Sequence, residues 1–162
     1  MTTTPEPTGA EIDLWRQSHM GHWLGAASQK FDRRVLWLVA RNEDVPLALA
    51  NLAGRGHLSA SHMHLTRHLA LAGLRLTDLA QRANMTKQAM GKLVEQCEAW
   101  GLVTRVADAR DARARRIIFT PTGVVWLQAF RQAVLQAEAE LRTAVGTEVA
   151  TVIALGLEAY AA

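Results

Sequence analysis

A chain of 162 residues is long enough to bury one substantial hydrophobic core without disulfide bonds, so a single domain is the simplest expectation. About half of the residues are hydrophobic and a fifth are charged, which excludes a disordered or a collagen-like protein. The formal net charge is only +3, and the one cysteine, Cys97, excludes an intrachain disulfide framework and fits a reducing compartment.

The sequence predicts neither secretion nor membrane insertion. Residues 1–10 are rich in Thr and Pro and lack a basic segment followed by an apolar one, so we expect a flexible arm and no signal peptide. Charged side chains interrupt every hydrophobic segment, which argues against a membrane span. We therefore expect a cytoplasmic protein with no membrane partner.

Residues 11–58 predict a group of N-terminal helices. Apolar residues recur at steps of three and four from Glu11 to Ala40, which is the pattern of a long amphipathic helix. Gly21 and Gly25 each lower helix propensity by roughly 1 kcal/mol relative to Ala, so we expect a kink or a break near them. Pro46 suits the first turn of a short helix that follows.

Residues 59–120 predict a helix-turn-helix followed by a hairpin. Ser59 or Ser61 suits the cap of a helix that runs to about Ala72, and Thr77 suits the cap of the next, short helix. After a tight turn, a second helix is expected. In a helix-turn-helix, the exposed face of this second helix contacts the binding partner.

Thr86 is expected to cap that second helix, which runs from Lys87 to about Trp100. Its two faces differ in character. The apolar face carries Met90, Leu93, Val94 and Cys97, and the opposite face carries Lys87, Gln88, Gly91, Lys92 and Gln96. Such a division predicts a helix that packs on a core through one face and offers the other to solvent or to a partner.

A two-stranded hairpin is predicted next. Leu102 to Val106 forms the first strand, Ala107 to Ala114 a charged loop, and Arg115 to Phe119 the return strand. Residues 121–162 then predict two C-terminal helices, because Pro121 suits a helix start and Gly146 breaks the pattern. The expected fold class is mainly α with a small β-hairpin wing, a winged helix-turn-helix flanked by N- and C-terminal helices.

Positive charge gathers on the helix-turn-helix and the hairpin. Between Arg82 and Arg116 there are eight basic and four acidic residues, whereas the rest of the chain has a net charge of −1. A run of charge on its own more often marks a solvated surface. Because this excess coincides with a motif shaped to enter a DNA groove, we interpret it as a surface for a polyanion.

Five short motifs follow one another in this central stretch. They are Leu76-Thr77-x-Leu79-Ala80, Met85-Thr86-Lys87-Gln88-Ala89-Met90, Leu93-Val94-x-x-Cys97-Glu98-x-x-Gly101-Leu102-Val103, Asp108-x-Arg110-Asp111-x-Arg113 and Phe119-Thr120-Pro121-x-Gly123. The series resembles the winged-helix core of the multiple antibiotic resistance regulator (MarR) family. The resemblance implies a homodimer held by the terminal helices, double-stranded DNA with a near-palindromic operator as the partner, and a cleft for a small aromatic or anionic effector.

The predicted DNA-binding residues lie on the second helix and on the wing. Lys87, Gln88 and Lys92 are candidates for base readout, since lysine pairs with guanine acceptors and glutamine pairs with adenine. Thr86 is positioned to contact a phosphate, although helix capping alone explains it. Ordinary surface positions are the alternative for all of them.

The wing adds a further group of candidates. Arg110 at the hairpin tip suits a narrow minor groove, where the negative potential is strongest. Asp108 and Asp111 are expected to brace the loop, and Arg113 is expected to pair with one of them or to contact a phosphate.

Several other residues could bind a metal or sense redox state, and for each of them we favour an ordinary structural or surface role. The predicted effector cleft is assigned to Trp23, Trp37, His64 and His68. His64 and His68 have a spacing that can clamp zinc, but no acid or Cys completes the set, so no metal and no cofactor are predicted. Cys97 is read as a small buried hydrophobic residue and not as a redox sensor.

The sequence therefore predicts a DNA-binding transcriptional regulator, a repressor released by a small-molecule effector. No catalytic site is predicted, because no phosphate loop, nucleophile elbow or pair of carboxylates is legible. The main alternative is a winged helix that binds an acidic protein partner through its basic face. A zinc enzyme built on the histidines is the least favoured alternative.

Overall fold

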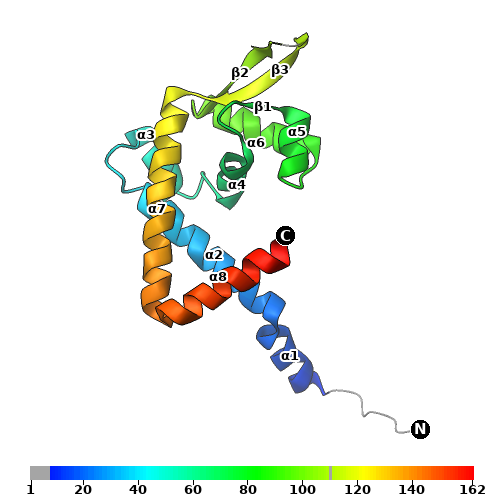
Figure 1. The fold of residues 1–162 in the computed structure, drawn as a ribbon, viewed down its shortest axis with the longest axis vertical. Helices are drawn as coiled ribbons and strands as arrows, with labels where there is room; N and C mark the ends of the chain where they lie inside the picture. The colour runs from blue at the N-terminus through cyan, green and yellow to red at the C-terminus, as the bar shows by residue number, and fades with distance from the viewer. Residues whose placement is uncertain (1–7, 110) are drawn as a thin grey trace, which may run out of the picture. The chain divides into compact units, whose positions relative to one another are not determined.

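The structure is a computed structural model that describes residues 8–109 and 111–162 (Figure 1). Its elements, in order, are α1 (Gly9–Ser18), α2 (Met20–Val39), α3 (Leu47–Gly54), α4 (Ala60–His68), β1 (Leu74–Arg75), α5 (Leu76–Arg82), α6 (Lys87–Ala99), β2 (Val103–Asp108), β3 (Asp111–Phe119), α7 (Pro121–Val145) and α8 (Thr147–Ala161). The described residues form two compact units, one up to Arg33 and one from Arg34 to Ala162. Within these described ranges, no helix combines the length and the apolar character needed to span a bilayer.

The first unit contains the helix break that the sequence predicts, at a different position. The break falls between Ser18 and Met20, and the two predicted glycines lie inside α2. His19 explains the position, because its Nδ1 accepts the backbone N–H of His22 at 3.2 Å and so caps the new helix. The indole N–H of Trp23 also donates to the carbonyl of Ser18 at 3.2 Å. Side-chain capping, which glycine cannot supply, decides where the helix is interrupted.

The core of the second unit lies between the helix-turn-helix and the sheet. The apolar face predicted for α6 is confirmed, since Met90, Leu93, Val94 and Cys97 are all buried. They join buried side chains from the helices, the strands and α7, the largest of which are Leu58, Met63, Leu65, Leu79, Leu102, Ile117 and Trp126. Burial stabilises the fold by roughly 1.5–3 kcal/mol for each large side chain. It fixes α6 on the core through its apolar face and leaves the opposite face exposed.

The wing is larger than the sequence predicts. β2 and β3 pair antiparallel up to Asp108 and Asp111, so most of the expected loop is strand. The charged side chains of this stretch can alternate with small ones along an exposed ribbon, which leaves the backbone free to pair. A third strand, β1, pairs with the other edge of β3, giving the order β1-β3-β2. Arg110, the predicted groove reader, lies outside the described residues.

Two helix boundaries also differ from the predictions. α4 ends at His68 and not near Ala72, and the N-cap of α5 is Arg75 and not Thr77. The second difference is due to β1, whose two residues need extended backbone immediately before α5. The cap predicted for α6 is confirmed, because the Thr86 hydroxyl accepts the N–H of Ala89 at 3.2 Å.

A tight junction joins the wing to α7. The Thr120 hydroxyl accepts the N–H of Gly123 at 2.9 Å, and the Thr120 N–H donates to the carbonyl of Leu102 at 3.1 Å. A Cβ placed on Gly123 would lie 1.9 Å from the carbonyl oxygen of Leu102. The start of α7 therefore lies against the backbone that follows α6, and only glycine fits at the contact.

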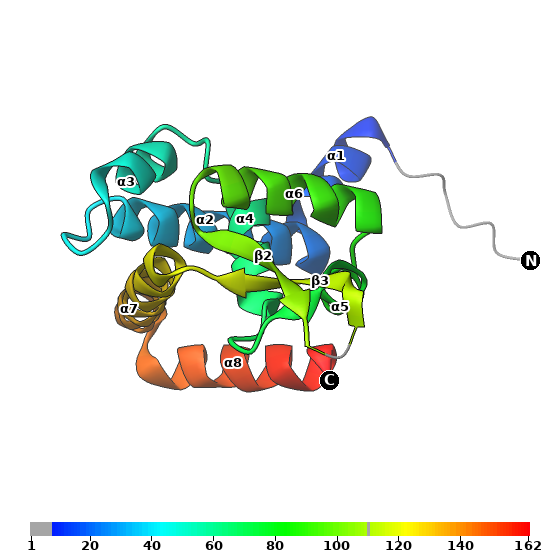
Figure 2. The same ribbon diagram turned by 90° about the horizontal axis from the view of Figure 1, so that it is seen from above.

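The C-terminal helices carry apolar side chains that nothing in this single chain covers. α7 leads away from the wing and α8 turns back after Gly146, whose φ is 88° (Figure 1, Figure 2). On α8 the only buried residue is Ala150. Its exposed large side chains are Val149, Val152, Ile153, Leu155, Leu157 and Tyr160.

We expect Gly123→Ala to lower the free energy of unfolding by about 3 kcal/mol, because the added methyl group must displace the Leu102 backbone. Chemical denaturation followed by circular dichroism measures this change. The matched control is Gly91→Ala inside α6, where the new Cβ would meet Leu76 at an ordinary 3.8 Å. That variant should gain about 0.5–1 kcal/mol from helix propensity. Equal stability of the two variants would contradict the close contact at Gly123.

Candidate nucleic-acid interface

The N-terminal end of α6 exposes the residues predicted to bind DNA, of which Lys87, Gln88 and Lys92 are predicted to contact bases and Thr86 a phosphate. Thr86, Lys87, Gln88 and Lys92 are all exposed, and they stand at the N-terminal end of the helix. Asn84, in the turn before α6, has a φ of 49°, a left-handed conformation that asparagine tolerates. Figure 2 shows α6 running beside the sheet, with its N-terminal end at the turn from α5. The helix can therefore offer these side chains to a groove while its other face stays in the core.

A polar chain that the sequence does not reveal ties α6 to α4. His62 is buried, and its Nδ1 accepts the backbone N–H of Ser59 at 3.0 Å. Its Nε2 lies 2.9 Å from Oε1 of Gln96, and its ring centroid is 4.7 Å from that of Trp100. Because Nδ1 accepts an amide N–H, Nε2 carries the proton and donates to Gln96. This chain holds the C-terminal half of α6 in place.

Arg75 braces the wing next to the hairpin turn, a role that the sequence analysis did not assign. Its Nε donates to the buried carboxylate of Asp108 at 2.8 Å, and its guanidinium is 3.9 Å from Asp111. The hydrogen bond and the charge of Asp108 raise the pKa of Arg75. Asp111 also accepts the backbone N–H of Arg113 at 3.0 Å. The two predicted bracing carboxylates thus meet an arginine from β1, which lies 33 residues earlier than Asp108 in the chain.

Of the other described arginines of the wing, some form bonds within the fold and others are exposed and can contact a polyanion. Arg116 donates to the carbonyls of Ala72 and Gly73, both at 2.7 Å, and Arg105 pairs with Glu98 at 3.1 Å. Arg113 and Arg115 are exposed and lie two residues apart on β3. Since alternate residues of a strand share a face, these two can contact the same polyanion.

The residues predicted for an effector cleft fall into separate groups. The rings of His64 and His68 meet edge to face with their centroids 4.5 Å apart, and Nε2 of His64 forms a hydrogen bond with the carbonyl of Ala83 at 2.9 Å. Burial, followed by the nearby charges of His64, Arg67 and Arg82, lowers the pKa of His68. No group of three or more metal-binding side chains occurs within residues 8–109 and 111–162.

The two tryptophans of the predicted cleft have other contacts. Trp37 is 45% exposed, and the guanidinium groups of Arg34 and Arg41 lie 4.3 and 3.7 Å from its ring centroid. Trp23 belongs to the first unit and packs on His22 at 5.0 Å. The cleft therefore stays a prediction.

Cys97 lies on the buried face of α6 and is shielded from solvent. Burial raises the pKa of its thiol to about 12. A thiol with this pKa holds almost no thiolate near neutral pH, and the thiolate is the form that oxidants and metals attack. The burial agrees with the reading of Cys97 as a small core residue.

Comparison with known proteins agrees with this geometry. Residues 58–114, which include α4, α5, α6, β2 and the first residues of β3, match the model described as the MarR family. No curated protein sequence matches the chain.

Solved structures share the fold over nearly the whole chain. One is the transcriptional repressor CouR bound to a 23-mer DNA duplex, with 16% identity, a TM-score of 0.66, and coverage of 98% of this chain and 100% of that one. A second is the MepR–DNA complex from S. aureus, with 17% identity, a TM-score of 0.63, and coverage of 88% and 96%. A third is the PcaV transcriptional regulator from Streptomyces coelicolor in complex with its natural ligand, with 17% identity, a TM-score of 0.60, and coverage of 89% and 92%.

We expect Asp108→Asn to destabilise the protein by about 1–3 kcal/mol, because a buried carboxylate that accepts a charge-assisted hydrogen bond is replaced by a neutral amide. Glu98→Gln makes the same isosteric change in the half-exposed pair with Arg105 and should alter stability by less than about 0.5 kcal/mol. Thermal unfolding of both variants gives the comparison. A larger loss for Glu98→Gln would show that Arg75 does not hold the wing as inferred.

Proposed function

We propose that this chain, whose residues 58–114 match the model of the MarR family, is a sequence-specific, double-stranded DNA-binding transcriptional regulator. The observation that carries the proposal is the exposed row of Lys87, Gln88 and Lys92 on a helix whose other face is fixed in the core. In a helix-turn-helix, the N-terminal residues of the second helix contact base edges in the major groove. Lysine and glutamine supply the donors and acceptors that such contacts need.

The wing supports the same proposal. A hairpin braced at Asp108 and carrying Arg113 and Arg115 on one face can follow the DNA backbone beside the groove. We propose that Arg110 at its tip enters the minor groove, as the sequence predicts. Together with α6, the wing would give contacts to two adjacent grooves from one rigid unit.

We propose that the functional form is a homodimer. The apolar side chains exposed on α8 need a cover, and a second copy of the same helices is self-complementary around a twofold axis. Two copies of α6 about 34 Å apart, one turn of DNA, would then recognise a near-palindromic operator. Residues 11–58 and 121–162 would supply the dimer contacts, and residues 59–120 would bind DNA.

We further propose repression that a small aromatic or anionic effector relieves. One structure with this fold is a repressor bound to DNA, and another holds its natural ligand, which supports both halves of the idea. Regulators of this kind act in the cytoplasm and by binding, so we propose no catalytic activity. An effector would act by favouring a spacing of the two α6 helices that no longer fits consecutive grooves.

The proposed function predicts that the protein selects one set of related DNA sequences from a random pool of duplexes. With the selected duplex, Lys87→Gln and Lys92→Gln should each weaken binding by about 5- to 150-fold, the cost of losing one good contact to a base or a phosphate. Arg110→Ala should weaken it by a similar factor. Fluorescence anisotropy at two salt concentrations measures these effects, and affinity should fall steeply with salt.

Arg55→Gln is the matched control for that experiment, since it removes one exposed positive charge outside the winged helix. Its affinity should stay within about twofold of the original. If selection returns no preferred sequence, or if Arg55→Gln weakens binding as much as Lys92→Gln, the hypothesis of sequence-specific DNA binding is wrong. An acidic protein partner for the basic face would then be the better hypothesis.

The proposed dimer predicts a mass twice the 17.8 kDa of the chain in sedimentation equilibrium. Leu155→Asp should yield monomers, because an uncompensated charge on the apolar face of α8 opposes its burial. Leu71→Asp is the control, since Leu71 is 72% exposed and Leu155 is 61% exposed, yet Leu71 lies outside the terminal helices. A monomeric original protein, or a dimer that survives Leu155→Asp unchanged, would contradict the proposed interface.

A further inference from the structure

His62 is a buried polar side chain on α4 that forms hydrogen bonds in two directions. It lies in the first turn of the helix and is only 5% exposed. On one side, its Nδ1 is 3.0 Å from both the backbone N and the Oγ of Ser59, the N-cap of α4. On the other side, its Nε2 is 2.9 Å from Oε1 of Gln96 on α6. One imidazole ring therefore connects the cap of α4 to the helix that carries the candidate DNA contacts.

The direction of each bond follows from the chemistry of the donors. The backbone N–H of Ser59 can only donate, so Nδ1 accepts and Nε2 carries the ring proton. Nε2 then donates to the side-chain oxygen of Gln96. A ring proton on Nδ1 would place two donors against each other at the backbone of Ser59. The two bonds of His62 thus support each other in a single arrangement.

The apolar core does not by itself determine the tilt of α6. The buried face of this helix consists of Met90, Leu93, Val94 and Cys97. Hydrophobic burial is non-directional, so it decides which face of the helix lies inside without fixing the helix axis. A hydrogen bond, in contrast, weakens steeply as its angle departs from a straight line. The bond from His62 therefore adds a directional constraint that the apolar contacts lack.

The place of this bond on α6 gives it leverage over the opposite end of the helix. Gln96 and Lys87 are separated by about 13 Å along the axis, at the rise of roughly 1.5 Å per residue of an α-helix. A tilt of about 10° at Gln96 would displace Lys87 by about 2 Å, whereas a binding constellation tolerates only about 0.5 Å. A second tie near this end of α6, between Glu98 and Arg105 at 3.1 Å, is half exposed and therefore weaker.

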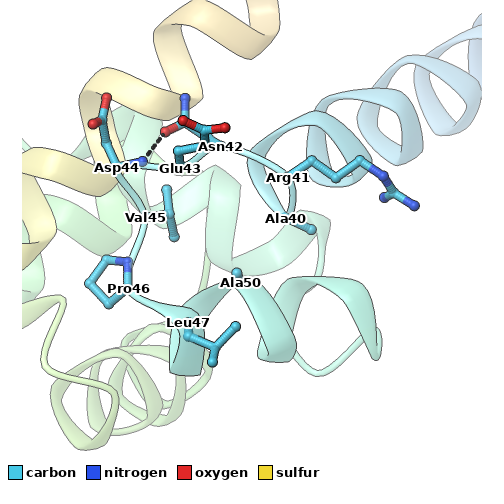
Figure 3. Close-up of a pocket in the computed structure, with 9 residues that line it drawn as sticks. All are labelled: Ala40, Arg41, Asn42, Glu43, Asp44, Val45, Pro46, Leu47 and Ala50. Atoms are coloured by element: carbon cyan, nitrogen blue, oxygen red, sulfur yellow. Dashed lines mark hydrogen bonds between the residues drawn. The ribbon is translucent and has the colours of Figure 1, made fainter.

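The hollow in Figure 3 does not reach this contact. It measures about 410 Å³, and its lining residues, 40–47 and 50, come from the end of α2, the loop that follows and the start of α3. Within that loop the Asp44 N–H donates to the side-chain oxygen of Asn42 at 2.9 Å, the dashed line in Figure 3. A molecule in this hollow would touch neither α4 nor α6, so it offers no direct control over the tilt of α6.

We propose that His62 is a positioning residue for base recognition, whose bond to Gln96 sets the tilt of α6 and thereby the selectivity among DNA sequences. Its other bond, to Ser59, serves the stability of α4. The inference rests on the proposed function, since it gives His62 a part in sequence-specific binding. It differs from the roles proposed for Lys87 and Lys92, which would contact DNA themselves, because a buried ring can act only through α6.

Two substitutions separate the two bonds of His62. In His62→Gln the side-chain amide nitrogen replaces Nε2 and can still donate to Gln96, whereas the bond to Ser59 is lost. In His62→Asn the side-chain amide oxygen replaces Nδ1 and can still accept from Ser59, whereas the bond to Gln96 is lost. Both variants lose the imidazole ring and its contact with Trp100, so that loss is common to the two.

The DNA experiment measures selectivity, defined as the ratio of the affinity for the selected duplex to the affinity for a duplex with one base pair of the half-site changed. Fluorescence anisotropy gives this ratio on the full chain, well below the melting temperature of each variant. We expect His62→Asn to reduce the ratio about three- to tenfold, the equivalent of one hydrogen bond. His62→Gln should keep the ratio of the original protein, although the lost cap lowers its melting temperature. A role limited to stability would leave both ratios unchanged.

Gln96→Met tests the same bond from the side of α6. Gln96 is exposed, so this change leaves the core intact. It should reduce the ratio as much as His62→Asn does, and the double variant should be no less selective than either single variant, because both residues act through one interaction. Gln81→Met makes the same change at an exposed position of α5 and is the matched control, with an unchanged ratio.

A measurement on the free protein separates the failure of this inference from the failure of the proposed function. Residual dipolar couplings of the α6 amides report the tilt of the helix without DNA. They should change in His62→Asn and remain as in the original protein in His62→Gln. Unchanged couplings in His62→Asn, equal ratios in the two His62 variants, or full selectivity in Gln96→Met would each overturn the inference. If the original protein prefers no DNA sequence, the proposed function fails, and the couplings alone decide whether His62 positions α6.

Discussion

The contact between Gly123 and the Leu102 backbone is the constraint on which the rest of the second unit depends. It joins the last residues after α6 to the first turn of α7, and Thr120 reinforces it by bonding both sides. If α7 and α8 hold the proposed dimer together, this one junction determines where each α6 lies relative to the α6 of the other subunit. A flexible connection here would leave the spacing of the two helices undefined, and recognition of two half-sites requires a fixed spacing.

The elements that were predictable from the sequence are those set by local pattern. The spacing of apolar residues predicted the buried face of α6, and the capping preference of threonine predicted the cap at Thr86. Pro121 predicted the start of α7. What escaped prediction depends on partners distant in the chain. β1 is only two residues long and exists because β3 pairs with it, and Arg75 braces a carboxylate 33 residues away. The predicted helix break is present, but its position at His19 is set by a capping imidazole and not by the nearby glycines, and an imidazole is an unusual capping signal in a sequence.

The same distinction applies to the basic charge of the winged helix. Counting charges marks the region as positive, but it cannot separate arginines that hold the fold from those that remain free to bind. Arg116 satisfies two backbone carbonyls before β1, and Arg105 pairs with Glu98, so these charges contribute mainly to the fold. Lys87, Lys92, Arg113 and Arg115 stay exposed. The surface available to a polyanion is therefore narrower than the count implies, and it coincides with the N-terminal end of α6 and one face of β3.

The proposed dimer would link the folding of the terminal helices to DNA recognition. α8 has 15 residues and buries only Ala150 against the rest of its own chain, whereas isolated helices of this length are marginal in water. Its stability must then come from the surface that covers Val152, Leu155 and the other exposed apolar residues. If a second copy supplies that surface, ordering α8 and forming the dimer are one equilibrium, which depends on protein concentration. Any change in the orientation of α7 would alter the same interface, because α7 connects the wing to α8.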